Sequence, residues 1–343
     1  MKTQTTTSAL QVSALLLGLA LLLSVAVGSV LIPPAAVYEL FRTRLSGADL
    51  PAALQPFSVI LFALRLPRTA LMALTGAALA GSGAAYQGLF RNPLADPYLI
   101  GVASGAGLGA IVAMTFRAPA SILGLMTVPA AAFAGALITV FIVYQLARVG
   151  QSLPTTNLIL AGVAVSAFAT AMTSFLMLNT SGELRRALVW LLGGAAMSGW
   201  QPVLAQIPYV VVGLGVLLTM GHALNVMQVG EEQAQQLGLP VNRVRLLVVL
   251  AASLTTAAAV SFAGIIGFVG LVVPHVVRMI WGADYRRILP LSILGGATLL
   301  LAADVLARVV LAPEEVPVGI IMSLIGAPFF LWVLRRAKNQ NFW

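Results

Sequence analysis

The polar residues that could do chemistry are few in this sequence, and most stand at the ends of apolar runs. Asp304 and Arg308 are four residues apart, a spacing that places a carboxylate and a guanidinium on one face of a helix. A carboxylate at the end of an apolar run could bind a cation or change its protonation. The adjacent arginine favours permanent ionisation, which is compatible with a structural pair and weakens the case for an ion-coupled carrier.

A second polar group interrupts the apolar sequence further upstream, and it reads Asn92-Pro93-Leu94-Ala95-Asp96-Pro97. Two prolines in six residues disfavour an uninterrupted helix. Irregular backbone at membrane depth is tolerated only where it lines protein or water. An ordinary loop between helices explains the same residues equally well, so both interpretations stay open at this point.

Motifs for catalysis or nucleotide binding are absent from the sequence. It contains no G-x-x-x-x-G-K-[ST] loop, no H-E-x-x-H and no G-x-S-x-G. There is no cysteine, and His275 has no second ligand at metal-binding spacing. We therefore expect no enzyme activity, no catalytic residue, no metal and no cofactor in this chain.

The elements that must position these residues are strongly apolar. Of the 343 residues 60% are hydrophobic and 8% are charged, whereas a soluble domain is typically about 25% charged. Apolar segments without interior charge run approximately over 9–32, 69–90, 98–116, 119–147, 155–178, 201–224, 246–263, 265–277, 288–303 and 316–334. Because one span takes about 20 apolar residues, we predict an all-α polytopic membrane protein with about ten transmembrane helices in a single domain, residues 1–343.

Two features of these segments predict details of the helix bundle. As one helix, the stretch from Leu246 to Val277 would be about 48 Å long, well beyond a bilayer core of about 30 Å. It must therefore break, and three glycines supply the place: Gly264, Gly267 and Gly270. The resulting hairpin puts three arginines on one membrane side: Arg243, Arg245 and Arg278.

Small residues at four-residue spacing predict close helix packing. They are Gly76, Ala80 and Ala84 in one segment, and Gly101, Gly105 and Gly109 in another.

The net charge of +9 does not predict nucleic-acid binding, because the basic residues are scattered between apolar runs and form no basic block. Membrane topology explains them better. With a cytoplasmic N-terminus, eleven basic residues lie inside and eight outside. This difference supports the orientation only weakly.

The longest polar loop inside the sequence covers residues 230–240 and reads GEEQAQQLGLP. Its good helix formers are bracketed by glycine and proline, which predicts a short amphipathic helix. With Ala234 and Leu237 on one side, such a helix could cap the bundle or dock into a groove of another protein.

Several segments together resemble the FecCD-type permeases, the membrane subunits of bacterial ABC importers for iron-siderophores, haem and cobalamin. The segments are Arg65-Leu-Pro-Arg68, the run from Gly76 to Pro97, the loop 230–240, Gly267 to His275, Asp304 to Arg308, and Glu315 to Phe330. The resemblance covers nearly the whole chain, and it implies the type II ABC importer permease architecture.

The resemblance also implies partners and a location. It implies a homodimer with the pathway along its twofold axis, two cytoplasmic ATPases that bind ATP and Mg, and an external substrate-binding protein. The expected location is the bacterial inner membrane, with both termini cytoplasmic. Lipid is the expected surroundings, and nucleic acid is not an expected partner.

Roles for individual residues follow from the same resemblance. By this resemblance, Asn92 and Leu94 are expected to form one part of a cytoplasmic gate, and Thr155 and Thr156 another. Within a cytoplasmic coupling loop at about 225–243, the expected ATPase contacts are Glu231, Glu232, Ala234, Leu237 and Gly238. The expected docking cations for the binding protein are Arg65, Arg68 and Arg308.

The predicted function is that of the permease subunit of an ABC importer for a metal chelate. An iron-siderophore is the first expectation for the cargo, and haem and cobalamin stay open. The alternative is an ion-coupled secondary transporter of a small solute, which would work without an ATPase. A membrane scaffold would show no solute flux under any energisation.

Overall fold

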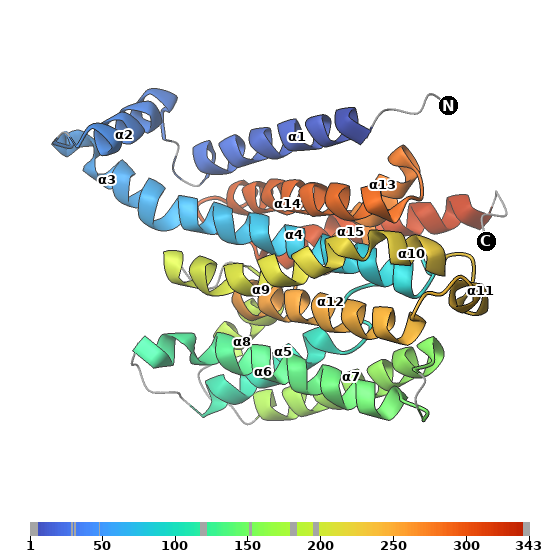
Figure 1. Ribbon diagram of the computed structural model, residues 1–343. Helices are drawn as coiled ribbons and strands as arrows, with labels where there is room; N and C mark the ends of the chain where they lie inside the picture. Colours follow the sequence, from blue (N-terminus) through green and yellow to red (C-terminus); the bar gives the residue numbers. More distant parts are fainter. Residues whose placement is uncertain are drawn as a thin grey trace.

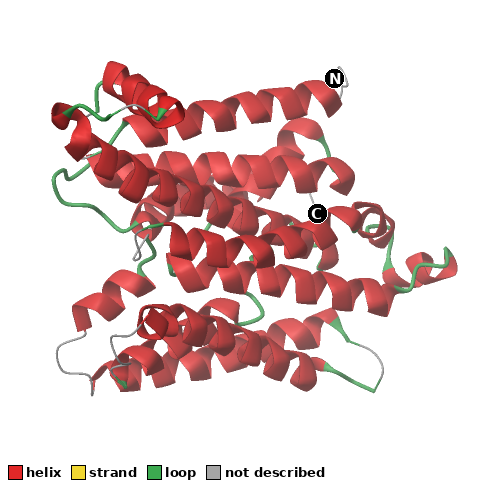
Figure 2. Ribbon diagram, turned by 60° about the vertical axis from the view of Figure 1, so that its left-hand side comes forward, coloured by secondary structure: helices red, strands yellow, loops and turns green. Residues whose placement is uncertain are grey.

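The structure is a computed structural model that describes residues 6–28, 30, 32–47, 49–116, 122–150, 153–178, 184–194 and 199–338. Figure 2 shows helices joined by loops throughout this part of the chain. The helices are α1 (Thr6–Ala26), α2 (Pro34–Ser46), α3 (Gln55–Ser58), α4 (Leu66–Leu89), α5 (Val102–Thr115), α6 (Ile122–Ala147), α7 (Thr155–Leu178), α8 (Leu184–Leu191), α9 (Trp200–Thr219), α10 (Gly221–Met227), α11 (Glu231–Gln236), α12 (Val241–Ala263), α13 (Val269–Trp281), α14 (Tyr285–Val309) and α15 (Val318–Lys338), with a 3-10 segment η1 (Ala52–Leu54) and a π-helical segment η2 (Val59–Arg65).

The prediction of about ten membrane spans is confirmed. In the described residues seven helical stretches are long and apolar enough to cross a membrane: Thr7–Ala26, Ala52–Leu89, Met126–Ala147, Thr155–Leu178, Trp200–Thr219, Val241–Ala263 and Tyr285–Val309. Three shorter apolar helices accompany them: Val102–Thr115, Val269–Trp281 and Val318–Val333. Two of the short helices, α5 and α13, directly follow interruptions of the helical backbone.

The long helices lie side by side, and the bundle has two distinct ends (Figure 1). At one end, called here the α11 end, lie α10 and α11 together with the start of α1 and the last turns of α15. At the other, the α2 end, lie α2 and α3. The polar residues described below fall into one group at each end and one group between α4 and α5.

Small residues bring helix backbones into direct contact, as their spacing predicts. A Cβ placed on Gly76 of α4 would lie 2.2 Å from the carbonyl oxygen of Gly296 in α14. A Cβ placed on Gly109 of α5 would lie 2.1 Å from the carbonyl oxygen of Ala131 in α6. Neither position can accept a larger residue without separating the helices.

The predicted break after residue 263 is also confirmed. Gly264 has φ +72°, and α13 begins only at Val269. Phe268 has φ +68°, an uncommon conformation for an aromatic residue. Its side chain packs on Gly326 of α15, where an added Cβ would lie 2.4 Å from the Cβ of Phe268. The start of α12 and the end of α13 both lie at the α11 end, as the hairpin requires (Figure 1).

Candidate functional site

The segment between α4 and α5 is folded by its own polar side chains. The side-chain oxygen of Asn92 accepts a hydrogen bond from the backbone nitrogen of Leu94 at 2.9 Å, and Asp96 accepts one from Tyr98 at 2.8 Å. Such turns are typical of Asn and Asp, whose side chains replace the helical partner of a nearby N–H group. The helix is therefore interrupted here, as the two prolines predict.

This interrupted segment is packed between α13 and α7. A Cβ placed on Gly270 of α13 would lie 2.6 Å from the Cδ of Pro97. A Cβ placed on Gly162 of α7 would lie 2.2 Å from the carbonyl oxygen of Leu99. The irregular backbone thus lies against protein, which is the condition under which a membrane protein tolerates it.

Tyr98 extends from this segment to the break between α12 and α13. Its hydroxyl donates to the carbonyl oxygen of Ile266 at 2.9 Å and accepts from the backbone nitrogen of Ile266 at 3.2 Å. Sequence reasoning missed this residue. The available indication was an aromatic hydroxyl directly after a broken polar segment, but the position of its partner could not be read from local spacing.

The four residues expected to form a gate lie on two separate elements. Asn92 and Leu94 belong to the interrupted segment, whereas Thr155 and Thr156 begin α7. Both Asn92 and Thr156 are exposed. In the part of the chain that the structure describes, no hydrogen bond joins the two pairs. Their role as a gate stays a prediction.

The expected coupling loop, 225–243, contains the end of α10, the whole of α11 and the start of α12. The side chain of Glu231 makes an ion pair with Arg245 of α12, while Glu232 and Gly238 are exposed. Ala234 is fully buried, whereas Leu237 is 71% exposed. The expectation that Ala234 and Leu237 lie on one side of the helix is therefore not met. The physical reason is that α11 packs its small residue inward and ends at Gln236, so that Leu237 follows outside the helix.

Polar contacts attach α10 to the neighbouring helix ends. Gln228, directly after α10, donates from its side-chain amide to the carbonyl oxygen of Gly88 in α4 at 2.9 Å. Asn225 donates to Asp284 at 2.6 Å and accepts from the backbone nitrogen of Tyr285 at 2.8 Å. Hydrogen bonds from the Arg286 side chain, with help from Asn225, lower the pKa of Asp284 to about 2. The sequence analysis did not single out Asn225 or Gln228.

The three arginines expected to form an external patch lie together at the α2 end, but two of them are buried. Arg65 donates to the carbonyl oxygens of Val25 at 3.0 Å and Ala26 at 3.1 Å. Arg308 donates to the carbonyl oxygen of Ser24 at 3.1 Å. These carbonyls belong to the last turn of α1, where a helix leaves acceptors without partners. Neither Arg65 nor Arg308 is free on the surface.

Arg68 is the partly exposed member of the three, with 19% of its side chain accessible. It pairs with Asp304 at 2.9 Å and with Glu315 at 2.5 Å. Asp304 is fully buried and also pairs with Arg308 at 3.1 Å, as their spacing predicts. One buried carboxylate thus faces two guanidinium groups, those of Arg68 and Arg308.

A bundle of apolar helices, two of them preceded by breaks that are packed inside the protein, defines a multi-pass membrane protein. The sequence matches the FecCD transport family over residues 16–336, and the chain belongs to this family. It is a membrane permease, and the family assignment confirms the resemblance seen in the sequence.

Named relatives share most of the chain. The cobalamin import system permease BtuC of Halobacterium salinarum is 51% identical over 81% of this chain and 73% of its own length. The hemin transport permease HmuU of Yersinia pestis is 42% identical over 81% of this chain and 84% of its own length. A solved structure described as an inward-facing conformation of a metal-chelate type ABC transporter has a TM-score of 0.82 at 31% identity, covering 95% of this chain and 98% of that chain.

Proposed function

We propose that this chain is the membrane-spanning subunit of an ABC importer for a metal chelate. Its relatives are named for cobalamin, hemin and, in Bacillus subtilis, Fe(3+)-citrate, which share a chelated metal. The complex contains two copies of the chain, two ATPase subunits that bind ATP and Mg, and an external binding protein. The α11 end faces the cytoplasm, so both termini are cytoplasmic, and the membrane is the bacterial inner membrane.

The observation that carries this proposal is the attachment of the α10–α11 loop to the rest of the bundle. Leu237 and Gly238 offer an exposed surface to a partner, and no nucleotide-binding motif exists in the chain. The side-chain amide of Gln228 donates a hydrogen bond to the carbonyl oxygen of Gly88, which lies four residues before Asn92. A displacement of α11 by an ATPase would therefore act on the end of α4 and on the segment that follows it.

The same part of the loop region is also attached to α14, through Asn225 of α10. Asn225 bonds both the cap residue Asp284 and the first helical residue Tyr285, and the Tyr285 hydroxyl accepts a hydrogen bond from Arg278 of α13 at 2.6 Å. A movement of α10 would thus reach α4, α13 and α14 together. Of these helices, α4 leads into the interrupted segment and α13 packs against it. Asn92 and Leu94 of that segment serve in this proposal as a cytoplasmic gate with Thr155 and Thr156.

An ion-coupled secondary transporter is the alternative, and the geometry of Asp304 weighs against it. Such a carrier needs a carboxylate that can lose its charge or bind a cation. The Asp304 carboxylate is already paired with two guanidinium groups, those of Arg68 and Arg308, which occupy the place that a transported cation would need.

The test is transport by the chain reconstituted in vesicles with a candidate ATPase and binding protein. We expect uptake of cobalamin, haem or a ferric chelate only with enclosed ATP, and no ATP hydrolysis by the chain alone. Uptake driven by a proton or sodium gradient without ATP would establish the secondary transporter instead. The ligand retained by a copurifying binding protein would identify the chelate.

A further inference from the structure

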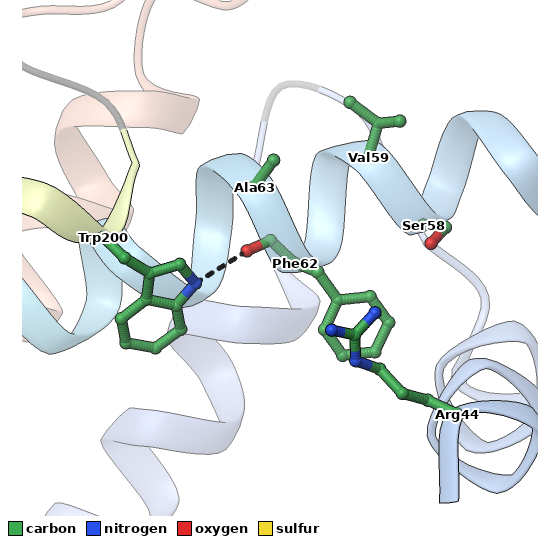
Figure 3. Close-up of a pocket in the computed structure, with 6 residues that line it drawn as sticks. All are labelled: Arg44, Ser58, Val59, Phe62, Ala63 and Trp200. Atoms are coloured by element: carbon green, nitrogen blue, oxygen red, sulfur yellow. Dashed lines mark hydrogen bonds between the residues drawn. The ribbon is translucent and has the colours of Figure 1, made fainter. Parts of the chain in front are cut away.

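An open cavity of about 570 Å³ lies at the α2 end of the bundle (Figure 3). Six residues line it: Arg44, Ser58, Val59, Phe62, Ala63 and Trp200. They come from α2, from the α3–η2 stretch that precedes α4, and from the first residue of α9. The chemistry of the lining is a cation, a hydroxyl and aromatic and aliphatic side chains. The proposed transport function uses none of these residues.

One wall of the cavity is fixed by the π-helical turn of η2. Pro67 has no backbone N–H, so the carbonyl oxygens of the preceding turn cannot all be paired in helical register. The backbone nitrogen of Leu66 donates to Leu61, which leaves the carbonyl oxygen of Phe62 without a donor in its own helix. The indole nitrogen of Trp200 donates to that oxygen at 3.2 Å. Figure 3 shows this bond, which holds the indole at the cavity wall.

The cation in the cavity, Arg44, lies against an aromatic ring. The guanidinium carbon of Arg44 lies 4.9 Å from the centre of the Phe62 ring, and Figure 3 shows the two groups face to face. Among the described residues no carboxylate makes an ion pair with Arg44, whereas its neighbour Arg42 pairs with Glu39 at 2.7 Å. A guanidinium stacked on a ring keeps its N–H donors free for a planar or tetrahedral anion.

The cavity lies where the apolar surface of the bundle begins. Trp200, Leu204, Ile207 and Val211 are all exposed and recur at helical spacing, so they form one apolar stripe along α9. The stripe starts at the cavity and runs toward the middle of a membrane-spanning helix. Tryptophan at the end of such a stripe is typical of the boundary between lipid tails and headgroups. The open side of the cavity is therefore continuous with the surface that faces lipid.

We propose that this cavity binds an anionic phospholipid of the leaflet at the α2 end. The Arg44 guanidinium receives the phosphate, and Ser58 lies in the same cavity as a further donor. The indole of Trp200 covers the glycerol region, and an acyl chain follows the stripe along α9. The volume is within the range of small-molecule sites, and the free positive charge of Arg44 favours a lipid with net negative charge.

The test measures lipid binding by the full chain purified in detergent. Phosphatidylglycerol is titrated and the bound fraction is read by native mass spectrometry for the natural chain, Arg44→Ala and Arg42→Ala. The two substitutions remove the same charge from the same exposed helix, but only Arg44 lines the cavity. We expect Arg44→Ala to weaken binding about tenfold and Arg42→Ala to leave it within about twofold, because a charge-assisted hydrogen bond to phosphate is lost only in the first.

A second measurement locates the lipid. Brominated phosphatidylglycerol should quench part of the tryptophan fluorescence, and Trp200→Phe should remove that part in a chain that still folds. Equal affinities of the natural chain and Arg44→Ala would overturn the proposal. So would displacement of the lipid by millimolar inorganic phosphate, which would indicate a site for the free anion. Loss of binding-protein capture in Arg44→Ala with unchanged lipid binding would assign the cavity to that protein.

Discussion

The hydroxyl of Tyr98 donates a hydrogen bond to the carbonyl oxygen of Ile266 at 2.9 Å and accepts one from the backbone nitrogen of Ile266 at 3.2 Å. Ile266 lies between Gly264 and Phe268, whose left-handed conformations end one helix and precede the next. Buried backbone groups outside a helix need other partners, and one side chain from the interrupted segment supplies them here. The two interruptions of the helical backbone are thus joined at a single residue.

We predict that Tyr98→Phe weakens both the fold and transport. The ring stays, but the N–H and C=O groups of Ile266 lose their partner, and an unsatisfied buried polar group costs about 1–3 kcal/mol. The melting temperature of the purified chain should fall by a few degrees. Uptake per ATP hydrolysed in the reconstituted complex should fall as well, because the interrupted segment is no longer attached to the break.

Tyr86→Phe is the matched control for this experiment. The Tyr86 hydroxyl lies 3.0 Å from the Ser253 hydroxyl, and Ser253 keeps a second partner in the carbonyl oxygen of Val249 at 2.5 Å. Removing this hydroxyl should therefore lower the melting temperature less and leave uptake per ATP unchanged. If both substitutions reduce uptake per ATP equally, the link between Tyr98 and Ile266 has no part in transport.

A further prediction concerns the buried charge at the α2 end. Asp304→Ala should destabilise the chain by about 3–5 kcal/mol, because it leaves the buried Arg308 without its counter-ion. Glu315→Ala should cost only about 0–1 kcal/mol, because Glu315 is 42% exposed and its pair with Arg68 is near water. The measurement is the loss of stability of each variant in thermal unfolding. Similar losses in the two variants would mean that Asp304 is not the central charge among these ion pairs.

Much of the fold could be predicted from the sequence because it depends on local spacing. The length of the run from Leu246 to Val277 required a break, and the glycines located it. The four-residue separation of Asp304 and Arg308 correctly predicted their pair. Small residues at the spacing of Gly76 and Ala80 correctly predicted close contact with another helix, which the structure shows to be α14. Each of these inferences depends only on segment length or on the spacing of residues along one helix.

The site could be predicted only in part, because its partners are distant in the sequence. Arg68 and Asp304 are 236 positions apart, and Tyr98 and Ile266 are 168 apart. No local pattern shows that the Arg65 guanidinium donates its hydrogen bonds to the carbonyl oxygens at the end of α1. The inward direction of Ala234 likewise depends on how a short helix packs on its own bundle. Tertiary packing decided whether these polar side chains became exposed or buried.

The coupling loop leads to a prediction on its exposed side. Leu237→Asp should leave the melting temperature of the chain unchanged, because the side chain is 71% exposed and surface changes cost little. In the reconstituted complex it should abolish ATP-driven uptake, because a charge would enter an apolar contact with the ATPase. Leu237→Met keeps an apolar side chain and should keep most of the uptake. Normal uptake by Leu237→Asp would show that this residue lies outside the ATPase contact.

The last prediction concerns capture of the external binding protein at the α2 end. Of the three arginines, Arg68 is the one with access to solvent, and Glu315 occupies part of its guanidinium at 2.5 Å. An acidic surface of the binding protein would have to compete with Glu315 for this group. Replacing Arg68 and replacing Glu315 should therefore change the association rate of the binding protein in opposite directions.

We expect Arg68→Gln to weaken binding of the binding protein several-fold and Glu315→Gln to strengthen it, since each charge near the rim of an interface acts mainly on the association rate. Both effects should fade as salt rises, because the Debye length shrinks to about 8 Å at physiological ionic strength. Arg42→Gln, at the same end and already paired with Glu39, controls for a general loss of positive charge. The measurement is the association rate on the reconstituted transporter across a salt series. A change of the same sign in Arg68→Gln and Glu315→Gln would assign this ion pair to stability of the fold and remove Arg68 from docking.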